Sequence, residues 1–176
     1  LGNQVEPNMP ETISYYTHTF KVDHTIGNRQ RLSGTGRFYK RISDYNNYLH
    51  SAATGEWFQF LSRAGSIDYV NTLSASMVLN LKYGYNRFIR ASDGNPESYG
   101  MDLTSLGFPS RFNDYTPKEI RRFPGINFSG AAYIGTRHDN FIRPIDTHAL
   151  TANVTKMKST HSIRGGIEFR AYRENQ

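Results

Sequence analysis

The chain has 176 residues, the size of one ordinary domain, and its 21 Lys+Arg against 15 Asp+Glu give a formal net charge of +6. It contains no cysteine, which excludes disulfide scaffolds, thiolate zinc sites and cysteine catalysis. Aromatic residues make up 14 %, too many for a typical disordered chain. No apolar run approaches the roughly 18 residues of a membrane-spanning helix. The chain opens without an initiator methionine or a recognisable signal peptide, so we expect it to be cut from a longer protein.

The first two predicted elements form a hairpin of alternating strands. Residues 13–25 place Phe20 and Val22 on one face with Tyr16, opposite a row of threonines and charged residues. Residues 30–42 repeat this pattern, with Leu32 and Phe38 on the apolar side. Successive side chains of a strand point to opposite faces, so each segment presents one apolar and one polar wall. The Gly-Asn pair at 27–28 between them predicts a tight turn.

A long irregular stretch, 43–67, precedes the second hairpin. Residues 68–74 are predicted as a short strand whose parity is ambiguous, because Tyr69 and Leu73 compete with Val70 for the apolar face. After a short turn, residues 78–90 show the clearest alternation in the chain. The side chains that we expect to face lipid from this strand are Leu79, Leu81, Tyr83 and Tyr85.

A second long stretch, 91–141, leads to the third hairpin, formed by residues 142–156 and 161–173. In the last strand Ile163, Ile167 and Phe169 share one face and are predicted to face lipid. Short turns therefore join the strands within each hairpin, and the two long stretches join the hairpins. Transmembrane β-barrels have this asymmetry, with short periplasmic turns and long extracellular loops.

The sequence thus predicts an all-β fold: an antiparallel up-and-down transmembrane β-barrel segment of about six strands, three hairpins and two long extracellular loops. The smallest bacterial barrels have about eight strands, so the segment is an incomplete barrel. We expect residues 1–176 to form part of one barrel domain.

Several motifs occur together and in one order along the chain. They are Val22-Asp23-His24, Leu79 to Phe88 (LNLKYGYNRF), Leu106-Gly107-Phe108-Pro109, Phe123-Pro124-Gly125-Ile126 and the closing run from His161 to Arg173 (HSIRGGIEFRAYR). As a set they resemble the Oar-like TonB-dependent outer-membrane receptors abundant in Acidobacteria, with Thr160 in place of the usual lysine before His161. The resemblance covers most of residues 13–175.

The resemblance implies a barrel of about 22 strands filled by an N-terminal plug. It implies energised uptake of a ligand by way of the TonB system, which acts through the plug. Neither the plug nor a TonB box is found in these 176 residues. The implied location is the outer membrane of a Gram-negative bacterium. The resemblance implies a class of transporter and no particular ligand.

Loop residues are the candidates for ligand contact, because loops carry recognition while a rigid scaffold holds them. Aromatic side chains mixed with arginine suit an oligosaccharide, a siderophore or a peptide as ligand, and packing of the loops into a cap is the alternative role. The candidates are Tyr48, Trp57, Phe58, Tyr99, Tyr115, Arg121 and Arg122. No catalytic motif, metal-binding spacing or cofactor loop is present, so we expect no enzyme activity, no metal and no cofactor.

Outer-membrane lipid and lipopolysaccharide are the expected surroundings. Four arginines near the loop ends of the strands, Arg41, Arg87, Arg90 and Arg173, are candidates to meet lipopolysaccharide phosphates. Two other interpretations remain. A soluble antiparallel β module that binds carbohydrate or another ligand would bury Leu79, Leu81, Ile163 and Phe169 under a second layer. Nucleic-acid binding is suggested by the pI near 9.6 and the interleaved aromatic residues. Strand parity scatters the basic residues between the inner wall and the loop rim, so we expect no nucleic-acid binding.

Overall fold

The computed structural model describes residues 12–45, 47, 49–130, 133–135 and 140–175. These residues fall into two compact units. The sheet unit comprises Tyr15–Arg41, Phe60–Arg90 and the described part of Arg143–Gln176. The loop unit comprises the described parts of Leu1–Ser14, Ile42–Gln59 and Ala91–Ile142.

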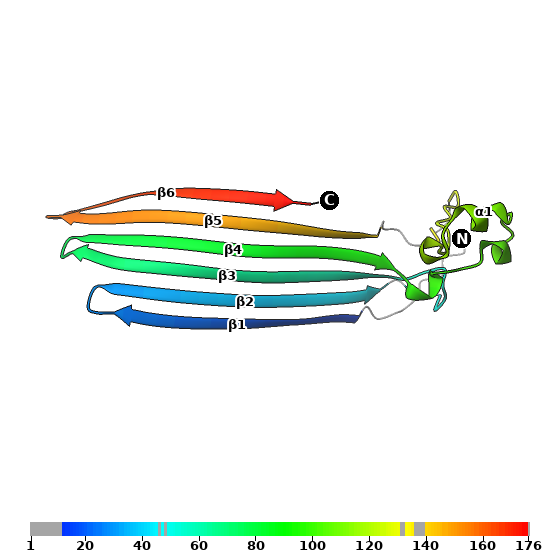
Figure 1. Cartoon of the computed structure of the whole chain (residues 1–176), viewed down its shortest axis with the longest axis horizontal. Helices are drawn as coiled ribbons and strands as arrows, with labels where there is room; N and C mark the ends of the chain where they lie inside the picture. The colour runs from blue at the N-terminus through cyan, green and yellow to red at the C-terminus, as the bar shows by residue number, and fades with distance from the viewer. Residues whose placement is uncertain (1–11, 46, 48, 131–132, 136–139, 176) are drawn as a thin grey trace. The chain divides into compact units, whose positions relative to one another are not determined.

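Six antiparallel strands follow one another in a single sheet in the order in which they occur in the chain (Figure 1). They are β1 (Thr12–Ile26), β2 (Gln30–Tyr45), β3 (Glu56–Ser74), β4 (Met77–Gly94), β5 (Phe141–Lys158) and β6 (His161–Glu174). Tight turns join β1 to β2, β3 to β4 and β5 to β6, all at one end of the sheet. The longer connections, 46–55 and 95–140, leave from the other end. The predicted up-and-down topology is confirmed.

Side-chain contacts between neighbouring strands fix which residues share a face. In the register of β5 with β6, Leu150 lies opposite Phe169 and Ala152 opposite Ile167. The Tyr83 hydroxyl on β4 lies 2.8 Å from Nδ1 of His148, two residues from Leu150 and therefore on the same face. We call the face that carries these residues the apolar face, and the opposite one the polar face.

The remaining strands continue both faces. Asn86 of β4 and Ser62 of β3 hydrogen-bond at 2.7 Å on the polar face. On the apolar face, Tyr69 of β3 donates to Gln30 of β2 at 2.8 Å. Phe38 of β2 stacks on Tyr16 of β1 with the ring centroids 5.8 Å apart. The seven residues predicted to face lipid all lie on the apolar face.

The apolar face has no covering layer among the described residues, and its side chains are widely exposed. Phe20 is 70 % exposed, Ile167 77 % and Phe169 66 %. Leu81 and Ile163 are exposed as well. A soluble sandwich would have buried these residues, so the exposed face counts against that interpretation.

The prediction for β3 was wrong in its length. The strand begins at Glu56 and runs for 19 residues, whereas the sequence predicted only its last seven, 68–74. Aromatic residues on adjacent positions, Trp57 and Phe58, break the alternation, and Phe58 is buried because it packs in the core of the loop unit. The contact of Tyr69 with Gln30 also shows that Tyr69 and Leu73, and not Val70, lie on the apolar face of the strand.

The loop unit contains the ends of β1 to β5 that lie away from the tight turns, together with four short helices. These are η1 (Pro96–Ser98), η2 (Leu103–Leu106), α1 (Arg111–Tyr115) and η3 (Lys118–Ile120). A single bridge pairs Ile126 with Ile134. The buried apolar residues of the described chain, Phe58 and Ala91, both belong to this unit.

Candidate functional site

Asn95 ties the two long connections together within the loop unit. Its side-chain amide donates to the carbonyl oxygens of Ser51 at 3.0 Å and Thr54 at 2.9 Å. Its Oδ1 accepts from the backbone N–H of Glu97 at 3.0 Å and caps η1. Asn95 is 8 % exposed. A buried amide with donors and acceptor all paired holds its partners in one arrangement, because leaving any of them unpaired would cost free energy.

A second network joins three segments that are far apart in sequence. The Tyr99 hydroxyl donates to Asp93 and accepts from Nδ2 of Asn140 at 2.5 Å. Oδ1 of Asn140 in turn accepts from Arg122 at 2.7 Å, and the Arg122 guanidinium carbon lies 5.4 Å from the centre of the Tyr99 ring. Burial and the hydrogen bond to Asp93 raise the pKa of Tyr99, so the hydroxyl stays protonated. We call Asp93, Tyr99, Arg122 and Asn140 the loop network.

Asp102 organises the segment beyond η1. Its carboxylate accepts from the backbone N–H and the hydroxyl of Thr104 at 2.9 and 2.7 Å, and from the Asn113 amide at 2.5 Å. These hydrogen bonds, led by that of the Thr104 hydroxyl, lower the pKa of Asp102. The carboxylate thereby caps η2 and fixes α1 beside it.

A close approach of two glycines fixes the last part of the loop unit. Gly135 has a φ of +117°, and a Cβ there would lie 2.6 Å from Cα of Gly125. Its N–H donates to the carbonyl of Ala53 at 2.9 Å. Only glycine fits this position, because a side chain would meet backbone atoms in a strained conformation.

The seven candidate ligand residues are placed differently by the structure. Tyr99 and Arg122 come together in the loop network, and Arg121 follows η3 directly with its Nε buried without a hydrogen-bond partner. Tyr115 ends α1 and is 85 % exposed, apart from the network. Tyr48 lies outside the described residues.

Trp57 and Phe58 require a correction, because they lie in β3 and not in a loop. Phe58 is 4 % exposed and is part of the core of the loop unit, so its ring is not available to a ligand in this structure. Phe58 therefore has the packing role that was the alternative to ligand contact for the loop aromatics.

The sequence reasoning missed Asn95 and Asn140, which hold the site together. The pair Asn95-Pro96 carried a signal, since asparagine before proline favours a turn and the cap of a helix. Asn140 carried none, because its partners Tyr99 and Arg122 are 41 and 18 residues away.

The polar face of the sheet unit is rich in cations. Lys21 pairs with Asp23 at 3.0 Å, and Arg170 pairs with Glu168. Arg41 places its guanidinium 5.7 Å from the centre of the Phe60 ring. By strand parity the cationic residues of this face are Lys21, Arg31, Arg37, Arg41, Lys82, Arg90, Arg143, Arg164 and Arg170. The acidic residues there are Asp23, Asp68, Glu168 and Glu174, so cations predominate.

The four arginines near the loop ends of the strands are divided between the faces. Arg87 lies on the apolar face 3.9 Å from Asp146, and Arg173 lies opposite Asp146 in the register. Arg41 and Arg90 lie on the polar face. Of the four candidates for lipopolysaccharide phosphates, only Arg87 and Arg173 therefore share a face with the exposed apolar residues.

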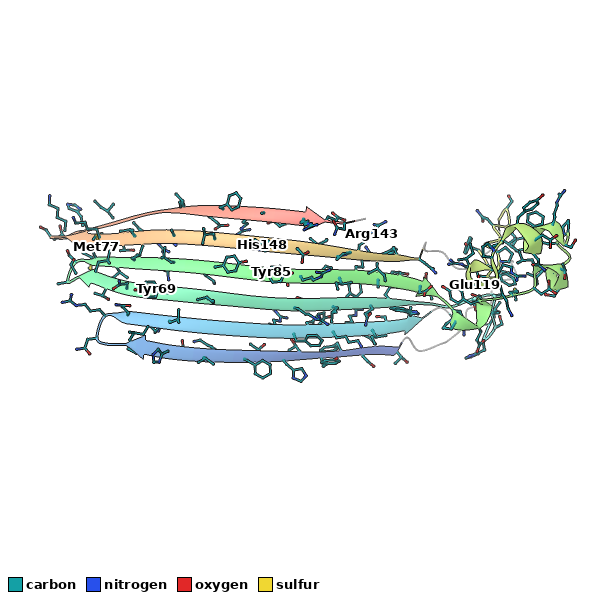
Figure 2. The ribbon with its side chains drawn as sticks, viewed as in Figure 1. Tyr69, Met77, Tyr85, Glu119, Arg143 and His148 are labelled. Carbon is teal, nitrogen blue, oxygen red and sulfur yellow. The ribbon has the colours of Figure 1, made fainter. Side chains whose placement is uncertain are left out.

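Two tyrosines of β4 contact β5 on the apolar face. Figure 2 shows Tyr85 beside His148, and their ring centroids are 4.9 Å apart. The Tyr85 hydroxyl donates to Oδ1 of Asp146 at 2.6 Å. These contacts cross from strand to strand in the middle of the sheet unit and fix both tyrosine rings.

Within the described ranges, no group of three His, Asp or Glu side chains converges in a way that could hold a metal ion. In the same residues, no helix has the length and apolarity needed to cross a membrane.

The exposed apolar face, the polar opposite face, and the alternation of turns with long connections define the class of the protein: an outer-membrane β-barrel. The comparison with protein families agrees. The chain belongs to the family described as outer membrane beta barrel domain, whose model matches residues 2–176. Comparisons with curated proteins and with solved structures found no match. The protein is thus located in the outer membrane of a Gram-negative cell.

Proposed function

We propose that this barrel segment belongs to a TonB-dependent transporter that takes up an oligosaccharide, a siderophore or a peptide and performs no covalent chemistry. The observation that carries the proposal is the loop network, in which Arg122 is stacked on Tyr99 and held by Asn140. A preorganised aromatic ring beside a guanidinium binds ligands at low entropic cost. The ordered motifs that resemble Oar-like receptors, from LNLKYGYNRF to the closing run, support the TonB-dependent class.

The polar face gives the transporter a cationic lining. In an outer-membrane barrel the face opposite the lipid surrounds the interior. Arg31, Arg37 and Lys82 would lie along this wall and attract acidic groups of a ligand or of a plug. The long connections, 46–55 and 95–140, would be extracellular and meet the ligand first.

Lipopolysaccharide is the proposed neighbour on the outside. The apolar face meets its acyl chains, and arginines that lie on this face meet its phosphates. The parity of Arg87 with Tyr85 and of Arg173 with Phe169 puts both arginines on the apolar face, which supports that contact.

Uptake by cells that carry the intact protein tests the proposal. Labelled maltohexaose, a ferric catecholate chelate and a casein peptide digest serve as probes for the three ligand classes. We expect one probe to enter only when the proton gradient is intact, and entry to fall in Y99A and R122A. The exposed Asn127, in the same unit, supplies the control N127A.

Two results would contradict the proposal. Uptake that continues after the gradient is collapsed would show a passive pore. A protein that is monodisperse in buffer without detergent would favour the soluble ligand-binding module.

A further inference from the structure

A hollow of about 500 Å³ opens on the apolar face of the sheet unit. It spans β1 to β4 at mid-length of the longer strands. The residues that shape it are Phe20, Val22, Gly34, Gly36, Gly65 and Tyr83. On a face turned toward lipid, a hollow of this kind is a place for part of a lipid molecule.

Glycines form the floor of the hollow. A Cβ added at Gly34 or Gly36 would meet nothing within 4 Å, and one at Gly65 would meet only the Thr35 carbonyl oxygen at 3.8 Å. The space above the backbone is therefore not filled by neighbouring side chains. None of the three has a positive φ, so these positions do not need glycine for their conformation.

The walls are apolar, and one of them is fixed. Phe20 and Val22 of β1 are each 70 % exposed on one side. On the other side Tyr83 and Tyr85 of β4 are held by the hydrogen bonds that join their hydroxyls to β5. Because these rings cannot turn into the hollow without breaking those bonds, the space stays open for a chain of methylene groups.

Cations border the hollow on the side of the long connections. Arg63 precedes Gly65 by two residues on β3, so it is the next side chain on the same face, and its Cζ lies 5.9 Å from the centre of the Phe38 ring. Arg87 follows Tyr85 in the same way on β4 and is exposed beside Asp146. The planar guanidinium group matches the geometry of phosphate oxygens.

An apolar hollow beneath two arginines fits an amphiphile with an acyl chain and a phosphate. The long connections of an outer-membrane barrel lie outside the cell, so the arginines lie toward the outer leaflet. We propose that the hollow binds one acyl chain of lipid A, the phosphorylated lipid of lipopolysaccharide, with a phosphate on Arg63 and Arg87. This inference rests on the proposed lipopolysaccharide contact and is independent of transport.

Native mass spectrometry of the intact protein, purified from the outer membrane in mild detergent, tests the assignment. The probes are bisphosphorylated lipid A, its dephosphorylated form, phosphatidylglycerol and inorganic phosphate. We expect the wild type to retain lipid A, and G36L to lose it because the leucine fills the hollow. Removing one cation in R63Q should weaken retention about fivefold.

Matched controls separate the site from general effects. Gly165 lies on the apolar face of β6, where a Cβ also meets nothing within 4 Å, so G165L makes the same change outside the hollow. Arg31 lies on the polar face and supplies the control R31Q. Both controls should retain lipid A as the wild type does.

The assignment is overturned if G36L retains as much lipid A as the wild type, or if R63Q and R31Q behave alike. Equal binding of phosphatidylglycerol, of dephosphorylated lipid A or of inorganic phosphate alone would also overturn it. If G36L does not fold, G34L makes the same test, since Gly34 has the same open space. Energised uptake is measured separately. Loss of lipid A retention with normal uptake, or the reverse, shows which of the two proposals fails.

Discussion

At the scale of single residues, the loop unit depends on polar side chains more than on apolar burial. Ser43, Thr54, Ser92 and Ser98 are all at most 3 % exposed, whereas Phe58 and Ala91 are the buried apolar residues of the described chain. Small buried hydroxyls contribute little hydrophobic free energy. Those of Thr54 and Ser98 donate to Asn47 Oδ1 and to the Asn95 carbonyl, whereas those of Ser43 and Ser92 have no hydrogen-bond partner among the described residues. The hydrogen bonds around Asn95 therefore do most to fix how the connections are arranged.

Asn95 should therefore be the most sensitive position of the loop unit. N95A leaves the Ser51 and Thr54 carbonyls without their donor, and we expect a loss of about 1–3 kcal/mol in the free energy of unfolding of this unit. N95D should be no less destabilising at neutral pH, because its carboxylate would face two carbonyl oxygens. Limited proteolysis at increasing urea concentration measures the effect.

The control for Asn95 is N127A, at an exposed asparagine of the same unit. A proteolysis profile of N95A equal to that of N127A would show that the amide does not hold the two connections together.

Asp102 makes the stability of its segment depend on pH. Hydrogen bonds lower its pKa in the folded state, so its contribution is present above the pKa of the unfolded chain, about 3.9. That contribution is lost as the pH falls through the lower, folded-state pKa. We expect D102A to be less stable than the wild type at neutral pH and the difference to shrink in acid. Thermal unfolding of the two proteins across this pH range is the measurement.

Asp114 offers the comparison for this prediction, because it is an exposed acid on the neighbouring α1. If D114A shows the same pH-dependent difference as D102A, the effect is one of net charge and the capping role fails.

At the scale of elements, the tyrosine hydroxyls join β4 to β5 on a face where water is scarce. Y85F removes the hydrogen bond to Asp146 and leaves a carboxylate less well paired. We therefore expect Y85F to unfold at a lower urea concentration than the wild type. The folded fraction in urea, read from the mobility of unheated samples on a gel, measures it. The control Y115F changes a ring that is 85 % exposed and should leave the folded fraction in urea as in the wild type.

The strands show how much of the fold could be predicted from the sequence. β4 and β6 alternate strictly, so both their extent and their faces were predicted closely. The part of β3 before residue 68 was missed for two reasons. Phe58 is buried in the loop unit, where the alternation of a two-faced sheet does not hold. Residues 60–67 (FLSRAGSI) show little apolar contrast between their two faces. Of the candidate site, Tyr99 and Arg122 were named, but their contact through Asn140 is a long-range pairing that no local pattern contains.

At the scale of the whole molecule, the two faces of the sheet should respond oppositely to charge. Leu150 lies on the apolar face and is 52 % exposed, and its neighbour Thr151 lies on the polar face opposite Glu168. In a membrane, L150K should lower the free energy of unfolding by about 2–4 kcal/mol if the residue lies near the middle of the bilayer. T151K should be tolerated because the new cation meets Glu168.

Urea titration of both variants in liposomes, followed by the mobility of unheated samples, makes this comparison. Equal tolerance of L150K and T151K would mean that the apolar face does not meet hydrocarbon.

The sequential order of the strands has a consequence for assembly. Bringing β4 against β5 closes a connection of residues 95–140, and this costs about 1.4 kcal/mol more chain entropy than closing residues 46–55 between β2 and β3. The hydrogen bond between Tyr99 and Asn140 brings the two ends of the longer connection together. If the loop unit forms early, it holds β5 near β4 and lowers the entropic cost of pairing the two strands. The order in which the hairpins join the sheet would then be determined by residues outside the membrane.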